Sequence, residues 1–396
     1  MGLGQRLGRR DRIGTLMMEF RWTEDGETKA ARWRSENGAP PPARGVTAGD
    51  AMTADAAYRL AREGSGLLWR GDFQNARKLM QAMDRRVGRR SPGKASGGLA
   101  EVFQQQRREQ EFRAHTLGMI LLPFDADHRV PLRRAPDVRQ ACLEAYGEAQ
   151  EPYVASLREL HGLIGAHEWR KTGIKVPVLG ARIHPHYGVF TPVRHEYADL
   201  VAAAAIPSRE LAFDIGTGTG VLAALLARRG VKRVVATDLD ARAVACAREN
   251  LDRLGYGPQV EVRETDLFPE GRAPLIVCNP PWIPAQPTST MERAVYDPDS
   301  RMLKAFLAGL AAHLEPQGEG WLILSDLAER LGLRSRAELE SAISAGGLKI
   351  AGRQDSRSRH PRTQDKEDPL HVARAAEVTS LWRLTVDPLR PASSPS

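Results

Sequence analysis

The sequence of 396 residues predicts an α/β fold, in which a seven-stranded, mostly parallel sheet follows a mainly helical N-terminal region. From about residue 195 onward, short apolar runs alternate with segments of helical periodicity, as in sheets whose strands are joined by helical crossovers. A glycine-rich turn directly follows the first of these runs, at the place where such sheets bind ligands. Before residue 165, apolar residues recur instead at helical spacing.

Composition limits the class of protein. Hydrophobic residues make up 42% and charged residues 27%, as in ordinary globular proteins. No apolar run reaches the roughly 18 residues that a membrane span needs, so we expect no membrane association. The three cysteines form no CxxC pair, which argues against a zinc site or a disulfide framework and favours a cytoplasmic location. The net charge of +8 favours an acidic partner such as RNA, DNA or the ribosome surface.

Four segments are expected along the chain. Residues 1–50 are polar and glycine-rich, and we expect them to be disordered or loosely attached. Residues 51–165 are expected to form a helical substrate-recognition domain. Residues 166–194 alternate apolar and polar side chains, which predicts a β-hairpin connector. Residues 195–390 are expected to form the domain that contains the sheet.

Two helices are predicted before the connector, one from Phe73 and one over residues 101–121. The first has apolar residues at helical spacing, and the opposite half of the helix is basic. Such a face is either a solvated surface or a contact for nucleic acid or the ribosome. Its basic residues are Arg77, Lys78, Arg85, Arg86 and Arg89.

The glycine turn, residues 214–220, predicts a cofactor loop. Gly216 and Gly218 fit the start of a dinucleotide fingerprint, but Val221 replaces its third small residue, which disfavours an NAD-dependent oxidoreductase. The carboxylate of Asp214 would repel a pyrophosphate and suits a ligand with a cationic amino-acid end, as in S-adenosylmethionine. Asp238, at the end of the second strand, is placed to bind ribose hydroxyls.

Two further acids follow strands in this region. Asp266 comes after the third strand and is placed to accept a hydrogen bond from the adenine amino group. Asp240 is expected to cap the next helix and not to bind a ligand. The alternative interpretation is that Gly216, Gly218 and Gly220 only close a turn, which binds no ligand.

The string Asn279-Pro280-Pro281-Trp282 follows the fourth predicted strand and predicts a site for a planar nitrogen. The prolines stiffen the turn, and their carbonyls remain free to accept hydrogen bonds. The Asn279 side-chain oxygen and the Pro280 carbonyl can each accept one N–H of an amide or aryl amine. Trp282 offers a ring face for a flat group. The alternative interpretation is a Pro-Pro turn with a purely structural role.

At these motifs the chain resembles class I S-adenosylmethionine-dependent methyltransferases of the "methyltransferase small" group. The resemblance spans about residues 185–386 and includes Thr265-Asp266 and Val277–Pro284. It implies a Rossmann-like seven-stranded methyltransferase sheet. It also implies that Asp214, Gly216, Gly218 and Gly220 line the methionine end of the cofactor, that Asp238 binds the ribose and Asp266 the adenine, and that Asn279, Pro280, Pro281 and Trp282 bind the target nitrogen.

The segment before the first strand, Gly188–Tyr197, is similar to a stretch that touches the cofactor in that family, which makes Phe190, Thr191 and Pro192 candidates. The chain looks most like the glutamine N5-methyltransferases of release factors and ribosomal proteins, whose motif has Tyr where this chain has Trp282. The ribosomal RNA guanine N2- and adenine N6-methyltransferases share the motif. Residues 1–165 match no N-terminal domain of these families.

We therefore expect an S-adenosylmethionine-dependent N-methyltransferase, and we favour a glutamine amide of a translation protein as the acceptor. The alternatives are an exocyclic amine of RNA or DNA, or a non-catalytic RNA- or ribosome-binding protein that keeps the fold. A protein or RNA partner is expected, with the oligomeric state left open. No metal is expected, because His184, His186 and His195 lack a fourth ligand. Cys278 is expected to be a small buried thiol.

Overall fold

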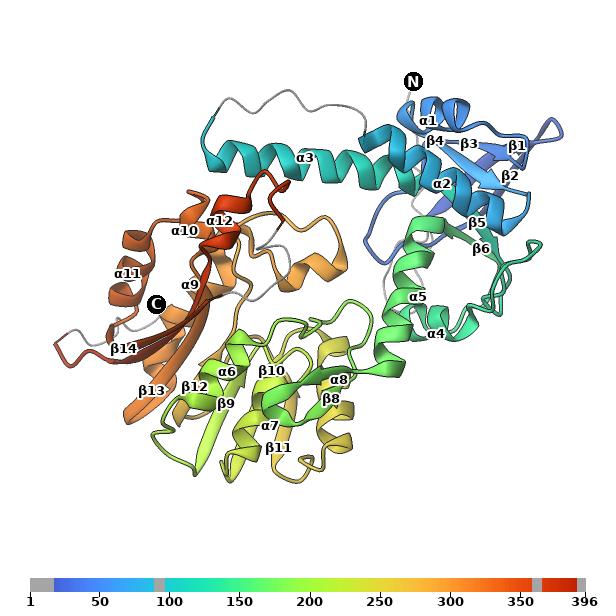
Figure 1. The fold of residues 1–396 in the computed structure, drawn as a ribbon. Helices are drawn as coiled ribbons and strands as arrows, with labels where there is room; N and C mark the ends of the chain where they lie inside the picture. Colours follow the sequence, from blue (N-terminus) through green and yellow to red (C-terminus); the bar gives the residue numbers. More distant parts are fainter. Residues whose placement is uncertain (1–17, 89–96, 358–364, 390–396) are drawn as a thin grey trace, which may run out of the picture. The chain divides into compact units, whose positions relative to one another are not determined.

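A computed structural model describes residues 18–88, 97–357 and 365–389 of the chain. The chain divides into two compact units (Figure 1). The N-terminal unit comprises Met1–Ala95 and Gln105–Glu168, and the C-terminal unit comprises Ser96–Gln104 and Trp169–Ser396. None of the helices in the described ranges has the length and apolar character of a membrane span.

The N-terminal unit is built around a closed six-stranded barrel. Its strands follow one another around the barrel in the order β1-β2-β6-β5-β4-β3. They are β1 (Glu19–Glu24), β2 (Glu27–Trp33), β3 (Arg44–Ala48), β4 (Ser65–Trp69), β5 (Ile120–Phe124) and β6 (Tyr153–Ser156). The helices that lie wholly in this unit are α1 (Ala54–Arg62), α2 (Phe73–Gly88) and α4 (Arg139–Tyr146). Most of α3 (Leu99–Gly118) and α5 (Leu157–Thr172) also belongs to it, while residues 99–104 and 169–172 belong to the C-terminal unit.

The barrel forms because its strands bury alternate or entire runs of apolar side chains. In β1, Phe20 and Trp22 are buried, whereas Glu19, Arg21 and Thr23 are exposed. This alternation is the period-two pattern of a strand with one face exposed to solvent. All five residues of β4 are buried, as in a strand covered on both sides. Together the inward residues form a core of Phe20, Trp22, Trp33, Leu68, Leu121 and Val154.

Two expectations for this half of the chain are wrong. Residues 18–50 are not loosely attached, since β1, β2 and β3 are three strands of the barrel, while residues 1–17 lie outside the described residues. Residues 51–165 are not simply helical, because β4, β5 and β6 lie among the helices. Each of these strands has only four or five residues, and an apolar run of that length is not distinguishable from part of a buried helix by periodicity.

The predicted helices and the hairpin are present within these limits. α2 starts at Phe73 and buries Phe73, Ala76, Leu79 and Met83, and α3 covers most of residues 101–121. The hairpin pairs β7 (Ile174–Val176) with β8 (Ala181–Ile183) in antiparallel register, and the turn between them is a 3-10 helix, η1 (Pro177–Leu179). The connector begins later than predicted, because α5 continues to Thr172.

The C-terminal unit contains a seven-stranded sheet in the order β11-β10-β9-β12-β13-β15-β14. Its neighbours pair in parallel except around β15, which is antiparallel to both β13 and β14. The strands are β9 (Leu211–Ile215), β10 (Arg233–Asp238), β11 (Val260–Glu264), β12 (Ala273–Cys278), β13 (Leu314–Ser325), β14 (Leu348–Arg357) and β15 (Val378–Val386). The predicted seven-stranded α/β sheet is therefore confirmed.

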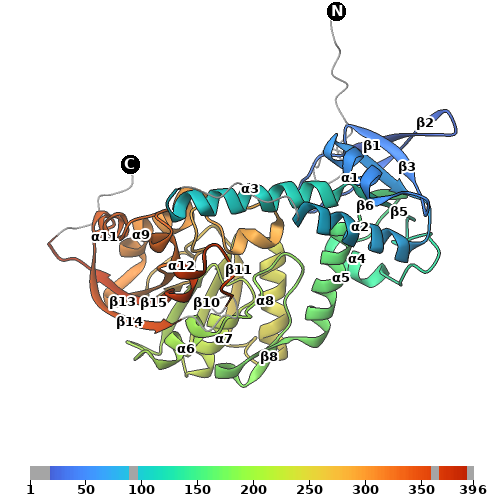
Figure 2. The ribbon, with the colours of Figure 1, turned by 45° about the horizontal axis from the view of Figure 1, so that its top comes forward.

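Helices cover both faces of this sheet (Figure 2). α6 (Glu196–Ala203), α7 (Val221–Arg228) and α8 (Ala241–Arg253) pack on one face, and α9 (Arg301–His313) and α11 (Arg336–Ala345) pack on the other. Shorter elements are α10 (Leu327–Arg330), α12 (His371–Ala375) and the 3-10 helices η2 (Thr290–Ala294) and η3 (Pro298–Ser300). β14 continues to Arg357, and residues 358–364 lie outside the described residues.

Gly45→Ala should destabilise the barrel. A Cβ at Gly45 would overlap the ring of Phe20 and lie 2.6 Å from the carbonyl oxygen of Arg21, where backbone cannot give way. We expect the free energy of unfolding to fall by about 1–3 kcal/mol, as for other overpacked cores. Urea unfolding followed by circular dichroism measures this. Gly49→Ala is the matched control, since its nearest neighbour lies 4.0 Å away, and unfolding of both variants at the same urea concentration would contradict the packing described.

Candidate functional site

The two sequence motifs lie at one edge of the C-terminal sheet. β9 is paired with β10 on one side and β12 on the other, so that Ile215 is level with Thr237 and with Cys278. The glycine loop leaves β9 at this level, and Asn279 follows β12 directly. Because parallel strands end at the same edge, the four groups Asp266, Asp238, the loop and Asn279 follow four neighbouring strands, β11, β10, β9 and β12.

The loop depends on glycine for its conformation. Gly216, Gly218 and Gly220 have φ angles of 70°, 55° and 81°, in the left-handed region that a side chain disfavours. A Cβ at Gly216 would also lie 2.6 Å from the terminal methyl of Met302. The loop thus brings its backbone to the strand edge with little side-chain bulk, and the N-terminus of α7 follows it immediately.

The carboxylate of Asp214 is hydrogen-bonded to both the glycine loop and α7. Its side chain is 1% exposed, and one carboxylate oxygen accepts hydrogen bonds from the Thr217 hydroxyl at 2.7 Å and from the Ala223 N–H at 3.0 Å. Burial raises the pKa of Asp214 to about 6, against the two hydrogen bonds, which lower it. The expectation that this carboxylate lines the site for a cationic group stays a prediction; what the structure shows is a carboxylate that ties the loop to α7.

Asp238 connects the loop to the neighbouring strand. One of its oxygens accepts the Gly218 N–H at 2.9 Å, and the other accepts the Asp240 N–H at 3.0 Å. Burial raises the pKa of Asp238. Asp240 caps α8 by accepting from the Arg242 N–H, which confirms its predicted structural role. Asp266 is exposed just beyond β11, at the same edge.

The Asn279–Trp282 turn is held on two sides. The N–H groups of Trp282 and Ile283 both lie 3.1 Å from the Val295 carbonyl, and the Asp297 N–H donates to the Ile283 carbonyl at 2.8 Å. Within the turn, the indole N–H of Trp282 donates to the side-chain oxygen of Asn279 at 2.9 Å. The turn is therefore fixed in both backbone and side chain. Pro280 is buried, and Pro281 is half-buried beside it.

The segment predicted from the family resemblance is only partly placed against the loop. Phe190 lies next to Gly218, because a Cβ built on that glycine would be 3.8 Å from the Phe190 Cβ. The Phe190 ring packs edge-on against Tyr197, with ring centroids 6.0 Å apart. Pro192 is buried and Thr191 half-buried, and the polar contact described for the Thr191 side chain, with the Val189 carbonyl at 3.5 Å, is internal to the segment.

Sequence reasoning missed Arg194. Its guanidinium lies over the Trp282 ring, 5.0 Å from the ring centroid, and it forms an ion pair with Glu377 at 3.0 Å. Glu377 in turn accepts a hydrogen bond from the Ser325 hydroxyl at 2.6 Å. Arg194 stands two residues after Pro192, but Glu377 is 183 residues further along the chain, so spacing alone gives no signal for the pair.

Two predictions about reactive side chains can be compared with the geometry. Cys278 is fully buried in the sheet, and burial raises the pKa of its thiol well above the ordinary value, which confirms the interpretation as an inert thiol. His184 and His186 are engaged by protein groups, His184 with the Arg170 carbonyl and His186 with Glu249. Among the described residues, no group of three or more His, Cys, Asp and Glu side chains is arranged to hold a metal ion.

The part of the chain that forms this edge matches a known family model. The family model called methyltransferase small domain matches residues 180–333, which include β9 to β12, the glycine loop and the Asn279–Trp282 turn. This part of the chain is therefore similar to methyltransferase small domains. The match begins in the turn of the hairpin, just before β8, and it leaves out the barrel, β14 and β15.

Curated relatives are similar to part of the chain. The release factor glutamine methyltransferase of Cereibacter sphaeroides is 39% identical over 131 residues, 32% of this chain and 43% of the relative. The ribosomal protein L11 methyltransferase of Pelotomaculum thermopropionicum is 46% identical over 69 residues, 17% and 22% of the two chains. The tRNA1(Val) (adenine(37)-N6)-methyltransferase of Bacteroides thetaiotaomicron is 31% identical over 141 residues, 33% and 59%. The chain thus spans from about a fifth to three fifths of these relatives.

Solved structures resemble the chain over about half its length. A ribosomal protein L11 methylase from Lactobacillus delbrueckii subsp. bulgaricus aligns with 48% of this chain and 76% of its own, at 20% identity and a TM-score of 0.33. A putative RNA methyltransferase from Pyrococcus horikoshii aligns with 48% and 83%, at 20% identity and a TM-score of 0.34.

Asp214→Asn should remove a pH dependence of stability. In the folded protein this carboxyl has a pKa of about 6, against an ordinary value of 3.8, so the native state holds the proton more tightly than the unfolded chain. Between these two values the free energy of unfolding should fall as the pH rises, by up to about 3 kcal/mol for this group. Thermal or urea unfolding from pH 3.5 to 7 should show the fall in the wild type and a smaller one in Asp214→Asn.

Thr217→Val gives the complementary result. The Thr217 hydroxyl is one of the two donors that lower the pKa of Asp214, so its loss should raise that pKa further. The fall in the free energy of unfolding should then extend to higher pH. Equal slopes in the wild type and Asp214→Asn would show that Asp214 does not titrate in this way.

Proposed function

We propose that the protein is an S-adenosylmethionine-dependent N-methyltransferase that acts on a planar nitrogen. The observation that supports this most strongly is the placement of the glycine loop and Asn279 after the neighbouring strands β9 and β12, at one edge of the sheet. A donor held at the loop and an acceptor held at Asn279 are then adjacent. Proximity of this kind accounts for a large part of the rate in bimolecular transfers.

The residues at the edge fit the donor that the family uses. The loop offers backbone with little side-chain bulk, and Asp238 presents a carboxylate whose position is fixed by the Gly218 N–H. In the proposal Asp238 binds the ribose, Asp266 the adenine, and the loop with Asp214 the methionine end. Bound S-adenosylmethionine supplies an electrophilic methyl on a sulfonium sulfur, which becomes a neutral thioether when the acceptor nitrogen takes the methyl and releases its proton to solvent.

On the acceptor side, Asn279 and Pro280 orient the nitrogen. The lone pair of an amide or aryl amine is delocalised, which makes it a poor nucleophile. Hydrogen bonds from its two N–H groups to the Asn279 side-chain oxygen and the Pro280 carbonyl would fix the NH₂ group and turn its lone pair toward the donor. No strong base is needed for this step.

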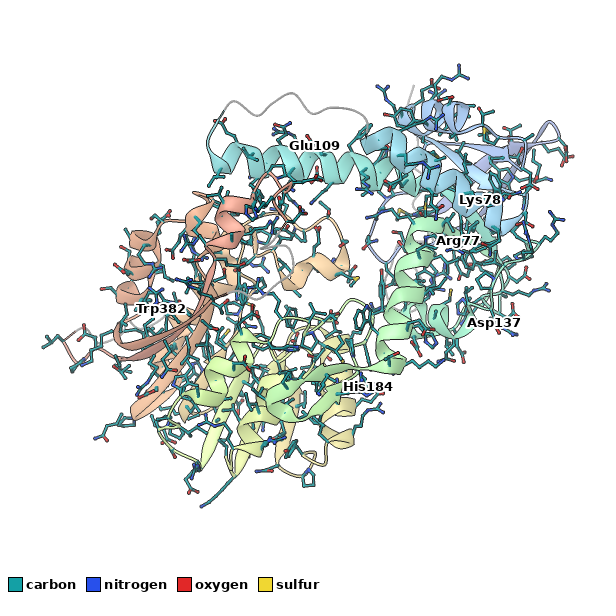
Figure 3. The ribbon with its side chains drawn as sticks, viewed as in Figure 1. Arg77, Lys78, Glu109, Asp137, His184 and Trp382 are labelled. Carbon is teal, nitrogen blue, oxygen red and sulfur yellow. The ribbon has the colours of Figure 1, made fainter. Side chains whose placement is uncertain are left out.

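We favour a glutamine side-chain amide of a translation protein as the acceptor, in a cytoplasmic setting that suits three buried, free thiols. The relative named a release factor glutamine methyltransferase supports this choice. The second candidate is an exocyclic amine of RNA, supported by the adenine-N6 relative and by α2, where Arg77 and Lys78 are exposed on the basic face (Figure 3). A base acceptor must be unstacked or flipped to reach the site.

The decisive experiment is transfer of a tritiated methyl group from S-adenosylmethionine into an extract of a strain that lacks the gene. Label that is lost on protease treatment indicates a protein acceptor, and label that is lost on nuclease treatment indicates a nucleic acid. Salt-sensitive RNA binding with no methyl incorporation in any extract, unchanged in Asn279→Ala, would instead support a non-catalytic RNA-binding protein.

Asn279→Ala and Asp238→Ala should separate the two halves of the site. We expect Asn279→Ala to reduce methyl incorporation at least about a hundredfold with S-adenosylmethionine affinity within about threefold, since it removes an acceptor contact. Asp238→Ala should weaken S-adenosylmethionine binding at least about tenfold, measured by titration calorimetry. Glu264→Gln is the control, because Glu264 is level with Asp238 on β11 and exposed. Equal loss of cofactor affinity in all three variants would contradict this division.

A further inference from the structure

The indole of Trp282 is bonded to the side chain that is proposed to bind the acceptor. Its N–H donates to the Asn279 oxygen at 2.9 Å. A carbonyl oxygen has two lone pairs, so this bond uses one and leaves one for an acceptor N–H. It also fixes the rotation of the carboxamide, which is otherwise a soft torsion in asparagine. The direction of the remaining lone pair is thereby determined.

The indole is itself held in place. Arg194 lies over its ring at 5.0 Å from the centroid, within the range of a favourable cation–π contact. Because the guanidinium covers one face, that face is not open to a flat acceptor group. The Trp282 side chain is partly buried and packs against three apolar clusters of the C-terminal unit.

The guanidinium of Arg194 is held by the carboxylates of two buried glutamates, Glu377 and Glu196. Its Nη1 lies 3.0 and 3.3 Å from the two oxygens of Glu377, and its Nη2 lies 3.6 Å from Glu196. Both glutamate side chains are only 4% exposed, so these interactions are screened little by water. Glu377 is fixed in turn by the hydroxyl of Ser325, at the end of β13.

We propose that Trp282 and Arg194 are positioning residues for the acceptor: the indole N–H orients the Asn279 carboxamide, and Arg194, anchored on Glu377, holds the indole in the donating orientation. This inference rests on the proposed function and names residues that act through Asn279. It also gives a physical reason for tryptophan at this place, since neither a phenyl nor a phenol group carries an N–H donor at the ring position that reaches Asn279.

The first test needs no acceptor. In a ¹⁵N–¹H spectrum, the indole resonance of Trp282 is the one that disappears in Trp282→Phe. Asn279→Ala should move that resonance upfield, because it removes the hydrogen-bond acceptor, and Arg194→Lys should also move it, because it removes the guanidinium from the ring face. An indole resonance that stays in place in Asn279→Ala overturns the proposal.

The second test measures methyl transfer from tritiated S-adenosylmethionine into the extract of the deletion strain. Trp282→Phe keeps an aromatic ring and removes the donor, and we expect it to slow incorporation by about tenfold to a hundredfold, as for small misplacements of reacting groups. S-adenosylmethionine affinity should stay within about threefold. Arg194→Lys should slow incorporation as well. The variant that combines Trp282→Phe with Arg194→Lys should be no slower than Trp282→Phe alone, because Arg194 acts through the indole.

Trp321→Phe is the matched control. Trp321 is a buried tryptophan in the same unit whose indole N–H also donates over 2.9 Å, in this case to Glu319. We expect it to lower stability and to leave the rate of incorporation per folded molecule within about threefold. A rate loss in Trp321→Phe equal to that in Trp282→Phe, or a wild-type rate in Trp282→Phe, overturns the positioning role. Absence of incorporation by the wild type contradicts the proposed function itself, while the indole spectra still decide whether Trp282 orients Asn279.

Discussion

The buried carboxylate of Asp214 is the interaction on which the arrangement of the site depends. Asp214 is the penultimate residue of β9, and its carboxylate accepts hydrogen bonds from the hydroxyl of Thr217 in the loop and from the first turn of α7. The three glycines permit the path of the loop, but the carboxylate selects it, because a buried acceptor without these donors would cost free energy. Asp238 then joins the same loop to the next strand, so Asp214, the glycine loop and Asp238 are connected by hydrogen bonds.

Much of the C-terminal unit could be predicted from the sequence, and the reason is local. The short apolar runs from about residue 195 predicted the strands of the sheet, because strands such as β10 and β15 are runs of apolar and β-branched residues between turn signals. Asp240 was predicted as a cap because an acid directly before an amphipathic helix has one common role. The family resemblance implied a seven-stranded sheet, and the order of its strands is known from the structure.

The remainder could not be predicted because its signals are not local. The barrel closes through pairings such as β2 with β6 and β1 with β3, and its strands are too short to show a clear period. The contacts of Trp282 likewise depend on a partner far along the chain, since Glu377 holds Arg194 across 183 residues. The sequence could place Trp282 beside Asn279, but the direction of its N–H required coordinates.

The C-terminal unit is not one continuous stretch of chain. Phe103, from α3, packs in the same apolar cluster as Ile283, the residue that follows Trp282, and its ring lies 6.5 Å from that of Tyr296, which is bridged to Ile283. A fragment that began at Trp169 would lose Phe103 and expose this cluster to water next to the Asn279–Trp282 turn. Separating the sheet from all of the chain before it would therefore also remove part of the packing beside Asn279.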